Sequence, residues 1–260
     1  MPQIIIRGVR WKAACPFVLV SALAARADAA DATDRLTRTL AWRPGAVIRV
    51  EATIADLTIV GSDRSDVAVE IVRRAPTAAD FTKYQPVVES SAGAVRIVVQ
   101  QSPDGRDPAL QSTIVVRAPS SAVFEVIRVF EGRIRLTSLS ASCDVDIRRG
   151  PIEASGLAGR IRLETGIGAM DVRDSTLTSG GMMRLRVFNG PLRVRLARLP
   201  ANARILAVTF NGTITSEIPL TMKDKFGPRF GETTIGSGDP VMSIDVVKGD
   251  IAIGVDKRQE

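Results

Sequence analysis

The side chains best suited to chemistry in this sequence are arginines and carboxylates, because the chain contains no histidine. Histidine is the commonest general base and a frequent metal ligand, so its absence removes the usual acid–base and metal chemistry. The carboxylates are scattered, as in Asp144 and Asp146 and then Asp171 and Asp174. No nucleophile, metal-ligand or phosphate-loop motif occurs. We therefore expect no catalytic residue, no metal and no cofactor.

The arginines are concentrated in the centre of the chain, where residues 120–200 hold 13 arginines, no lysine and 8 acidic residues. Several come in pairs two residues apart, such as Arg133 and Arg135, which places both on one face of a strand. Such a strip could bind an anionic glycan, lipid headgroups or nucleic acid. The alternative is neutralisation by acids on neighbouring strands, which the repeat described below favours for most of the arginines. The candidates left for an anionic ligand are Arg133, Arg148, Arg149 and Arg195.

These charged residues belong to a sequence repeat that is centred on glycine and determines where they lie. Gly132 has apolar residues five and three positions before it and two and four positions after it: Ile127, Val129, Ile134 and Leu136. Further copies centre on Gly93, Gly150, Gly168, Gly190, Gly212 and Gly249, and Ala55 stands in the glycine position of another. Strand side chains alternate, so the buried row changes parity at the glycine and the chain must bend there. A period near 20 residues predicts an all-β fold, a single elongated β-solenoid-like domain of short stacked strands with glycine corners.

The same frame makes predictions for the aromatic residues and the cysteine. Phe130, Phe188 and Phe210 each lie two positions before a repeat glycine, opposite the buried row. We expect them to form an outer apolar stack covered by residues 217–240, in preference to a sugar-stacking platform, because carbohydrate sites usually use Trp or Tyr. Cys143 shares strand parity with Val145, so we expect it to be buried and unreactive.

The chain divides into three sections by composition. Residues 1–29 have the features of a secretory signal peptide: basic residues, an apolar run over 13–25 and a small-residue cleavage site at 27–29. An uncleaved anchor is the alternative. Residues 30–119 form an N-terminal β section, with an exposed loop at 102–108, and 120–260 form the regular repeat section with an excursion at 217–240. We expect residues 241–255 to close the fold as a last copy, and the mature chain to have no transmembrane segment.

The N-terminal phrase Pro44-Gly45-Ala46-Val47-Ile48-Arg49-Val50, followed by Leu57-Thr58-Ile59-Val60-Gly61-Ser62-Asp63, resembles the opening of a large bacterial family of exported putative adhesins, a domain of unknown function. The phrases Val187-Phe188-Asn189-Gly190-Pro191-Leu192, Thr209-Phe210-Asn211-Gly212-Thr213-Ile214 and Val247-Lys248-Gly249-Asp250-Ile251 look like that family's repeats. The resemblance covers residues 40–256. It implies a β-solenoid, a location in the envelope or at the surface, and no established catalysis.

These observations predict an exported protein, periplasmic or at the cell surface, that acts as a non-catalytic adhesin-like binding or scaffold module. Its expected partner is an envelope protein or an anionic glycan, and specific nucleic-acid binding is not expected. Two alternatives stay open. One is a carbohydrate-active β-solenoid enzyme, which a cluster of acids in a groove would support. The other is a structural envelope protein that self-associates through the edges of its terminal repeats.

Overall fold

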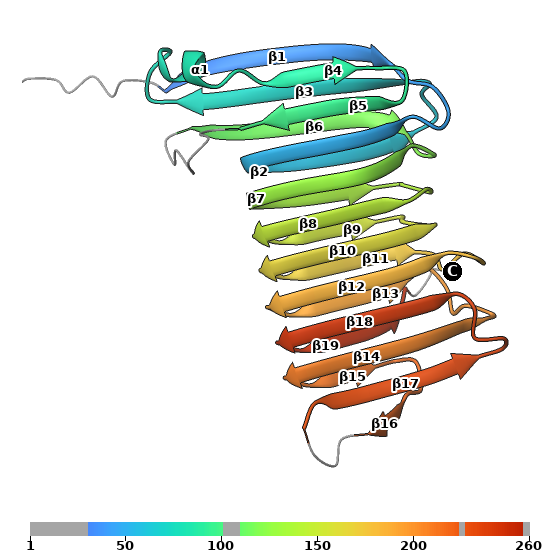
Figure 1. Cartoon of the computed structure of the whole chain (residues 1–260). Helices are drawn as coiled ribbons and strands as arrows, with labels where there is room; N and C mark the ends of the chain where they lie inside the picture. Colours follow the sequence, from blue (N-terminus) through green and yellow to red (C-terminus); the bar gives the residue numbers. More distant parts are fainter. Residues whose placement is uncertain (1–30, 101–109, 224–226, 257–260) are drawn as a thin grey trace, which may run out of the picture. The chain divides into compact units, whose positions relative to one another are not determined.

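A computed structural model describes residues 31–100, 110–223 and 227–256 (Figure 1). The predicted signal peptide and the loop predicted at 102–108 lie outside the described residues. The described part is nearly all β, as predicted, with one short helix, α1 (Asp80–Lys83). Its strands are β1 (Ala32–Ala41), β2 (Val47–Ser62), β3 (Asp66–Ala75), β4 (Val87–Ser90), β5 (Ala94–Val99), β6 (Gln111–Pro119), β7 (Val123–Thr137), β8 (Cys143–Arg149), β9 (Ile152–Ser155), β10 (Arg160–Ile167), β11 (Met170–Ser175), β12 (Met182–Asn189), β13 (Leu192–Leu196), β14 (Ala203–Asn211), β15 (Ile214–Ser216), β16 (Thr221–Lys223), β17 (Arg229–Ile235), β18 (Val241–Lys248) and β19 (Ile251–Val255).

Five copies of the sequence repeat, centred on Gly150, Gly168, Gly190, Gly212 and Gly249, form a strand before the glycine and a strand after it, and we call this unit a rung. In the Ala55 and Gly132 copies one continuous strand, β2 or β7, forms the rung. The expectation for Gly93 is wrong, because β4 and β5 pair antiparallel as a hairpin around it. The first strands of neighbouring rungs pair in parallel with one another, and so do the second strands, as β8 and β9 do with β10 and β11. Homologous positions lie opposite each other, so that Leu163 pairs with Val145 on one side and Leu185 on the other. The rungs therefore stack in register.

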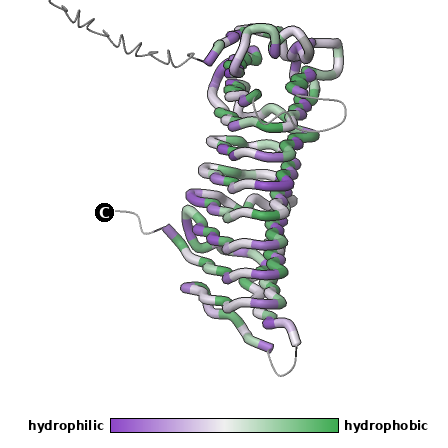
Figure 2. Tube along the Cα trace, turned by 90° about the vertical axis from the view of Figure 1, so that its left-hand side faces the viewer, coloured by the Kyte–Doolittle hydropathy of each residue, from purple (hydrophilic) through white to green (hydrophobic). Residues whose placement is uncertain are grey.

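The residues predicted to face inward form one continuous core. All four apolar positions of the Gly132 rung and of the Gly150 rung are buried. Figure 2 shows the corresponding alternation of hydrophobic and hydrophilic residues along the stacked strands. Two buried threonines, Thr165 and Thr209, occupy inward positions of other rungs. Each donates its hydroxyl to a repeat-glycine carbonyl of the neighbouring rung at 2.9 Å, so neither polar group is left unsatisfied.

The repeat glycines are required because the rungs approach each other most closely at the bend. A Cβ on Gly150 would lie 1.7 Å from the carbonyl oxygen of Gly132, and one on Gly190 would lie 2.1 Å from that of Gly168. Both residues also have positive φ, 138° and 147°, which favours glycine. Ala55 differs from the repeat glycines in that it has no positive φ and lies opposite Ser112 of β6 in place of another repeat centre.

The C-terminal rung is not the last in the stack. Strands β18 and β19 lie between the rung of β12 and β13 and the rung of β14 and β15, with parallel pairing on both sides (Figure 1). The reason is the excursion at 217–240, which forms the hairpin β16–β17. Strand β17 pairs antiparallel with β14 and occupies its outer edge. That edge is closed to the C-terminal rung, which is inserted on the other side of β14.

Antiparallel strands also end the stack at the N-terminal section. Strand β2 pairs in parallel with β5 and β6 on one side and with β7 on the other. Strands β4, β3 and β1 then add antiparallel to β5, β6 and β3 respectively. The buried side chain of Arg73 in β3 holds this end together. Its guanidinium donates to the Asp34 carboxylate in β1, with Nε–Oδ2 2.9 Å, and to the carbonyls of Phe81 and Tyr84.

Candidate functional site

The candidate site lies along the bend of the rungs, and we call it the glycine edge. It consists of the residues one and two positions before each repeat glycine and the residue directly after it. Because the buried row changes parity at the glycine, both residues before it face solvent. Arg148 and Arg149 are both exposed for this reason, and so are Phe188 and Asn189. The edge therefore presents more side chains to solvent per rung than a continuous strand would.

Three of the four predicted arginines come together on this edge, from the neighbouring rungs of Gly132 and Gly150. Arg149 pairs in register with Glu131, but its Nη1 lies 3.8 Å from Glu131 Oε2. Arg133 Nε lies 3.8 Å from Glu153 Oε1 and has no hydrogen-bond partner among the described residues. Both distances are too long for a direct hydrogen bond. Arg148 forms no ion pair with any residue that the structure describes.

A depression of about 300 Å³ adjoins Arg148 on the outer face of the first strands. Its charged and aromatic lining comes from three neighbouring rungs. Glu51 belongs to β2, Arg128 and Phe130 belong to β7, and Asp146 belongs to β8. The side chain of Phe130 is 40% exposed. The depression thus combines a partly exposed aromatic ring with two guanidinium groups and two carboxylates. The carboxylates lie in register on either side of Arg128, so Arg148 is the guanidinium group left for an anionic sugar.

Arg195 lies elsewhere, on the outer face of the second strands, and it is fully engaged. Its guanidinium donates to Asp256 (Nε–Oδ1 2.9 Å) and to the Val255 carbonyl, and it forms an ion pair with Glu217 at 3.4 Å. These contacts hold the inserted strand β19 between its neighbours. Burial raises the pKa of the Asp174 carboxyl, and the nearby Asp256 charge adds to the effect. The proximity of Asp174 and Asp256 therefore results from the contacts that hold the end of the chain, and it does not indicate a catalytic site.

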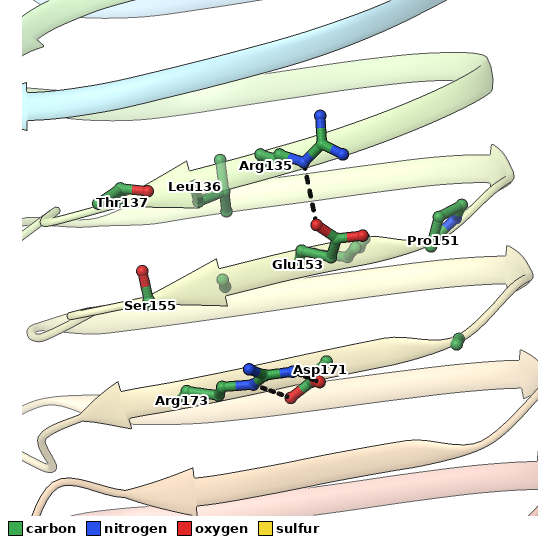
Figure 3. Close-up of a pocket in the computed structure, with 11 residues that line it drawn as sticks. Arg135, Leu136, Thr137, Pro151, Glu153, Ser155, Asp171 and Arg173 are labelled. Carbon is green, nitrogen blue, oxygen red and sulfur yellow. Dashed lines mark hydrogen bonds and ion pairs between the residues drawn. The ribbon is translucent and has the colours of Figure 1, made fainter.

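Several of the remaining arginines on the strand faces form ion pairs with acids. Arg135 donates to Glu153 at 3.0 Å, and Arg173 donates to Asp171 at 3.1 Å, in a shallow depression of about 410 Å³ (Figure 3). On the opposite face Arg162 lies 3.2 Å from Asp144. Of these, the Arg135–Glu153 pair joins residues at the same offset from neighbouring repeat glycines, which is the cross-strand pairing that the repeat predicted. Asp171 instead pairs with Arg173 of its own strand, although Arg193 lies opposite it in register. The charged side chains of this depression pair with one another, so it is a weaker candidate for a ligand site than the glycine edge.

The prediction that residues 217–240 cover the phenylalanines is wrong. Phe188 is 59% exposed and Phe210 is 63% exposed. Strand β17 begins at Arg229, opposite Thr209, and so stops short of Phe210. Sequence reasoning also missed Ile167, which is 52% exposed one position before its glycine. The signal was present, since both positions before a glycine become exposed when the parity changes.

Within the described ranges, neither the cysteine nor the carboxylates form a recognisable catalytic or metal site. Cys143 is buried as predicted, with 1% exposure, and burial raises the pKa of its thiol, with a smaller effect from the Asp144 charge. Among the described residues no group of three or more Cys, Asp or Glu side chains is placed to hold a metal ion. None of the described helices has the length and apolar character needed to cross a membrane.

Comparison with known proteins gives similarity to solved structures alone. No protein-family model matches the chain, and no curated protein sequence matches it. A putative cell adhesion protein from Clostridium sporogenes is similar over 86% of this chain and 100% of its own, at 11% identity and a TM-score of 0.48. A putative adhesin from Bacteroides fragilis is similar over 86% of this chain and 97% of its own, at 10% identity and a TM-score of 0.28. A putative adhesin from Parabacteroides merdae is similar over 86% of this chain and 96% of its own, at 8% identity and a TM-score of 0.28.

Proposed function

We propose that this chain is an exported, non-catalytic, adhesin-like binding module whose scaffold is a β-solenoid and whose ligand is an anionic glycan of the cell envelope or surface. The observation that carries the proposal is the convergence of Arg133, Arg148 and Arg149 on the glycine edge with long or absent ion pairs. Neighbouring rungs are about 4.8 Å apart, so the edge offers guanidinium groups at short, regular intervals. A polymer with repeated carboxylates or sulfates could engage several of them together.

The depression beside Arg148 supports a sugar in preference to a simple anion. Phe130 can pack against the face of a sugar ring while Arg148 holds its acidic substituent. We do not assign Arg195 to the ligand site. Its ion pairs with Glu217 and Asp256 hold the end of the chain in place, so its role is structural. The resemblance of the repeat phrases to exported adhesins supports the same class of function.

The enzyme alternative has less support. The Asp256 carboxylate accepts hydrogen bonds from the Asp174 amide and from Arg195. The two carboxylates that line the depression beside Arg148, Glu51 and Asp146, lie in register on either side of Arg128. Self-association through open parallel rungs also has less support, because antiparallel strands cover β14 at one end of the stack and β5 and β6 at the other. The short strand β15, which pairs with β19 on one side, is the parallel edge that remains in the described ranges. A binding module with its contacts along one edge accounts for more of the observed exposure.

The test is binding of dextran sulfate and polygalacturonate, with neutral dextran as reference, across a salt series. The test variant replaces all three edge residues: Arg133→Ala, Arg148→Ala and Arg149→Ala. The matched control removes the same charge from outward positions off the edge: Arg160→Ala, Arg184→Ala and Arg193→Ala. We expect the edge variant to bind about tenfold or more weakly, since each charge-assisted hydrogen bond contributes on the order of 1.5–3 kcal/mol. Equal losses in the two variants would show that only overall charge matters and would overturn the site.

A further inference from the structure

We infer that a second section of the glycine edge docks on an anionic lipid surface, which goes beyond the proposed glycan binding. This section is an apolar ridge made of one exposed or half-exposed apolar side chain from each of four consecutive rungs: Ile167, Phe188, Val247 and Phe210. Insertion of β18 and β19 brings Val247 between the two phenylalanines.

The pairing registers align three of the four ridge residues. Asn189 lies opposite Lys248 and Lys248 opposite Asn211, so the residues directly before them, Phe188, Val247 and Phe210, form one column. Ile167 lies opposite Asn189 and so extends the adjacent column into the next rung. With a spacing of about 4.8 Å per rung, the four side chains span roughly 15 Å. Rows of exposed apolar side chains of this kind mark interaction sites on soluble proteins. The bend of the chain places them on a projecting edge, where a flat surface can reach them.

The charges around the ridge favour an anionic surface. The next rung, directly beside Ile167, contributes Arg148 and Arg149, and Lys248 lies within the ridge itself. Neither Arg148 nor Lys248 forms an ion pair with a residue in the described ranges. Across the four rungs of the ridge the edge positions include one acid, Asp250. Its carboxylate accepts hydrogen bonds from the Thr213 amide and hydroxyl at 2.8 and 2.7 Å. The section is therefore apolar with a cationic border, which is the pattern of interfacial membrane binding.

The size of the ridge favours lipid over a second protein. If an aromatic side chain presents about 200 Å² in all, the two phenylalanines expose roughly 250 Å² and the whole ridge on the order of 400 Å². A stable protein–protein interface needs about 800 Å² on each partner. A row of side chains this narrow suits shallow insertion among headgroups, where the arginine and lysine side chains reach the lipid phosphates.

The experiment is co-sedimentation with vesicles of phosphatidylcholine alone and of phosphatidylcholine mixed with phosphatidylglycerol. The protein begins at Ala30, so that the apolar run at 13–25 cannot itself bind lipid. It keeps every described strand, all of which belong to the unit Asp31–Glu260. The ridge variant is Phe188→Ser with Phe210→Ser. The matched control is Leu199→Ser, which removes another exposed apolar side chain from a loop away from the ridge.

We expect binding to the mixed vesicles, about tenfold or more weaker in the ridge variant and unchanged in the control, because interfacial binding scales with apolar area. The variant Arg148→Gln with Lys248→Gln should reduce binding to that seen with phosphatidylcholine alone. In a Phe210→Trp protein, the tryptophan emission should shift to shorter wavelength on the mixed vesicles.

Equal vesicle binding by the original protein and the ridge variant, or no emission shift, would overturn the proposal. So would the absence of vesicle binding together with a concentration-dependent dimer that the ridge variant abolishes, because the surface would then be a protein interface. The glycan test uses soluble polymers without lipid. Loss of vesicle binding with intact dextran sulfate binding would therefore count against the ridge alone and leave the proposed function standing.

Discussion

The close approach of neighbouring rungs at the glycine edge predicts that Gly190→Ala is severely destabilising. A Cβ there would lie 2.1 Å from the Gly168 carbonyl oxygen, so the two rungs must separate by about 1 Å to restore ordinary contact. That movement strains the backbone hydrogen bonds from Gly168 N to Asn189 O and from Met170 N to Pro191 O, both 3.0 Å. The positive φ of 147° adds a conformational cost.

Three effects contribute to the loss of stability. The left-handed backbone costs about 1–2 kcal/mol, weakening two hydrogen bonds costs about 1 kcal/mol, and overpacking costs about 1–3 kcal/mol. The expected loss in the free energy of unfolding is therefore about 3–6 kcal/mol, a large part of the roughly 5–15 kcal/mol that stabilises a domain. Chemical denaturation followed by circular dichroism would measure it.

Two glycines separate the causes of this loss. Gly45 has a φ of 89°, and a Cβ added there would have no atom within 4 Å, so Gly45→Ala should show the conformational cost alone. Gly212→Ala would meet the Gly249 carbonyl oxygen at 1.9 Å without a positive φ, and should show the steric cost alone. If Gly190→Ala lost no more stability than Gly45→Ala, the close approach of the rungs would not be the reason for the glycine.

Other regions give three further predictions. The hydroxyl and amide of Thr213 lower the pKa of the Asp250 carboxyl below its ordinary value of 3.8, so the charged form stabilises the fold above that value. Asp250→Asn should therefore be less stable than the original protein at neutral pH, and the difference should shrink as the pH falls through the lowered pKa in thermal melts; a difference that grows in acid would contradict this. Cys143 should resist a thiol reagent in the native protein and react fully in denaturant, because its thiol is buried with a raised pKa; rapid native labelling would refute the buried placement. Asp34→Ala should cost about 3 kcal/mol in denaturation, because it leaves the buried guanidinium of Arg73 without its carboxylate; a neutral effect would show that the carbonyls alone satisfy it.

The sequence predicted which residue types make up the candidate site and which of them recur at the same offset from successive repeat glycines. Arg133, Arg148 and Arg149 could be singled out because the repeat columns place few acids beside them. Arg195 could not be assigned correctly in this way, since its partners Glu217 and Asp256 come from rungs whose order in space differs from their order in the chain. The exposure of Phe210 likewise depended on where β17 begins, which no local pattern specifies.

The amino-acid sequence by itself determined the strands, the bend at each glycine and the buried row. These follow from local rules, because side chains alternate along a strand and only glycine fits where two rungs meet. The tertiary structure alone decided which rung lies beside which. Parallel rungs with the same pattern of apolar residues can pair equally well in several orders. The repeat pattern therefore does not determine which rung lies next to which. The hairpin β16–β17 resolves this by closing one edge of β14, and the C-terminal rung is inserted as a consequence. The position of Val247 between Phe188 and Phe210 and the anchoring of Arg195 both depend on that insertion.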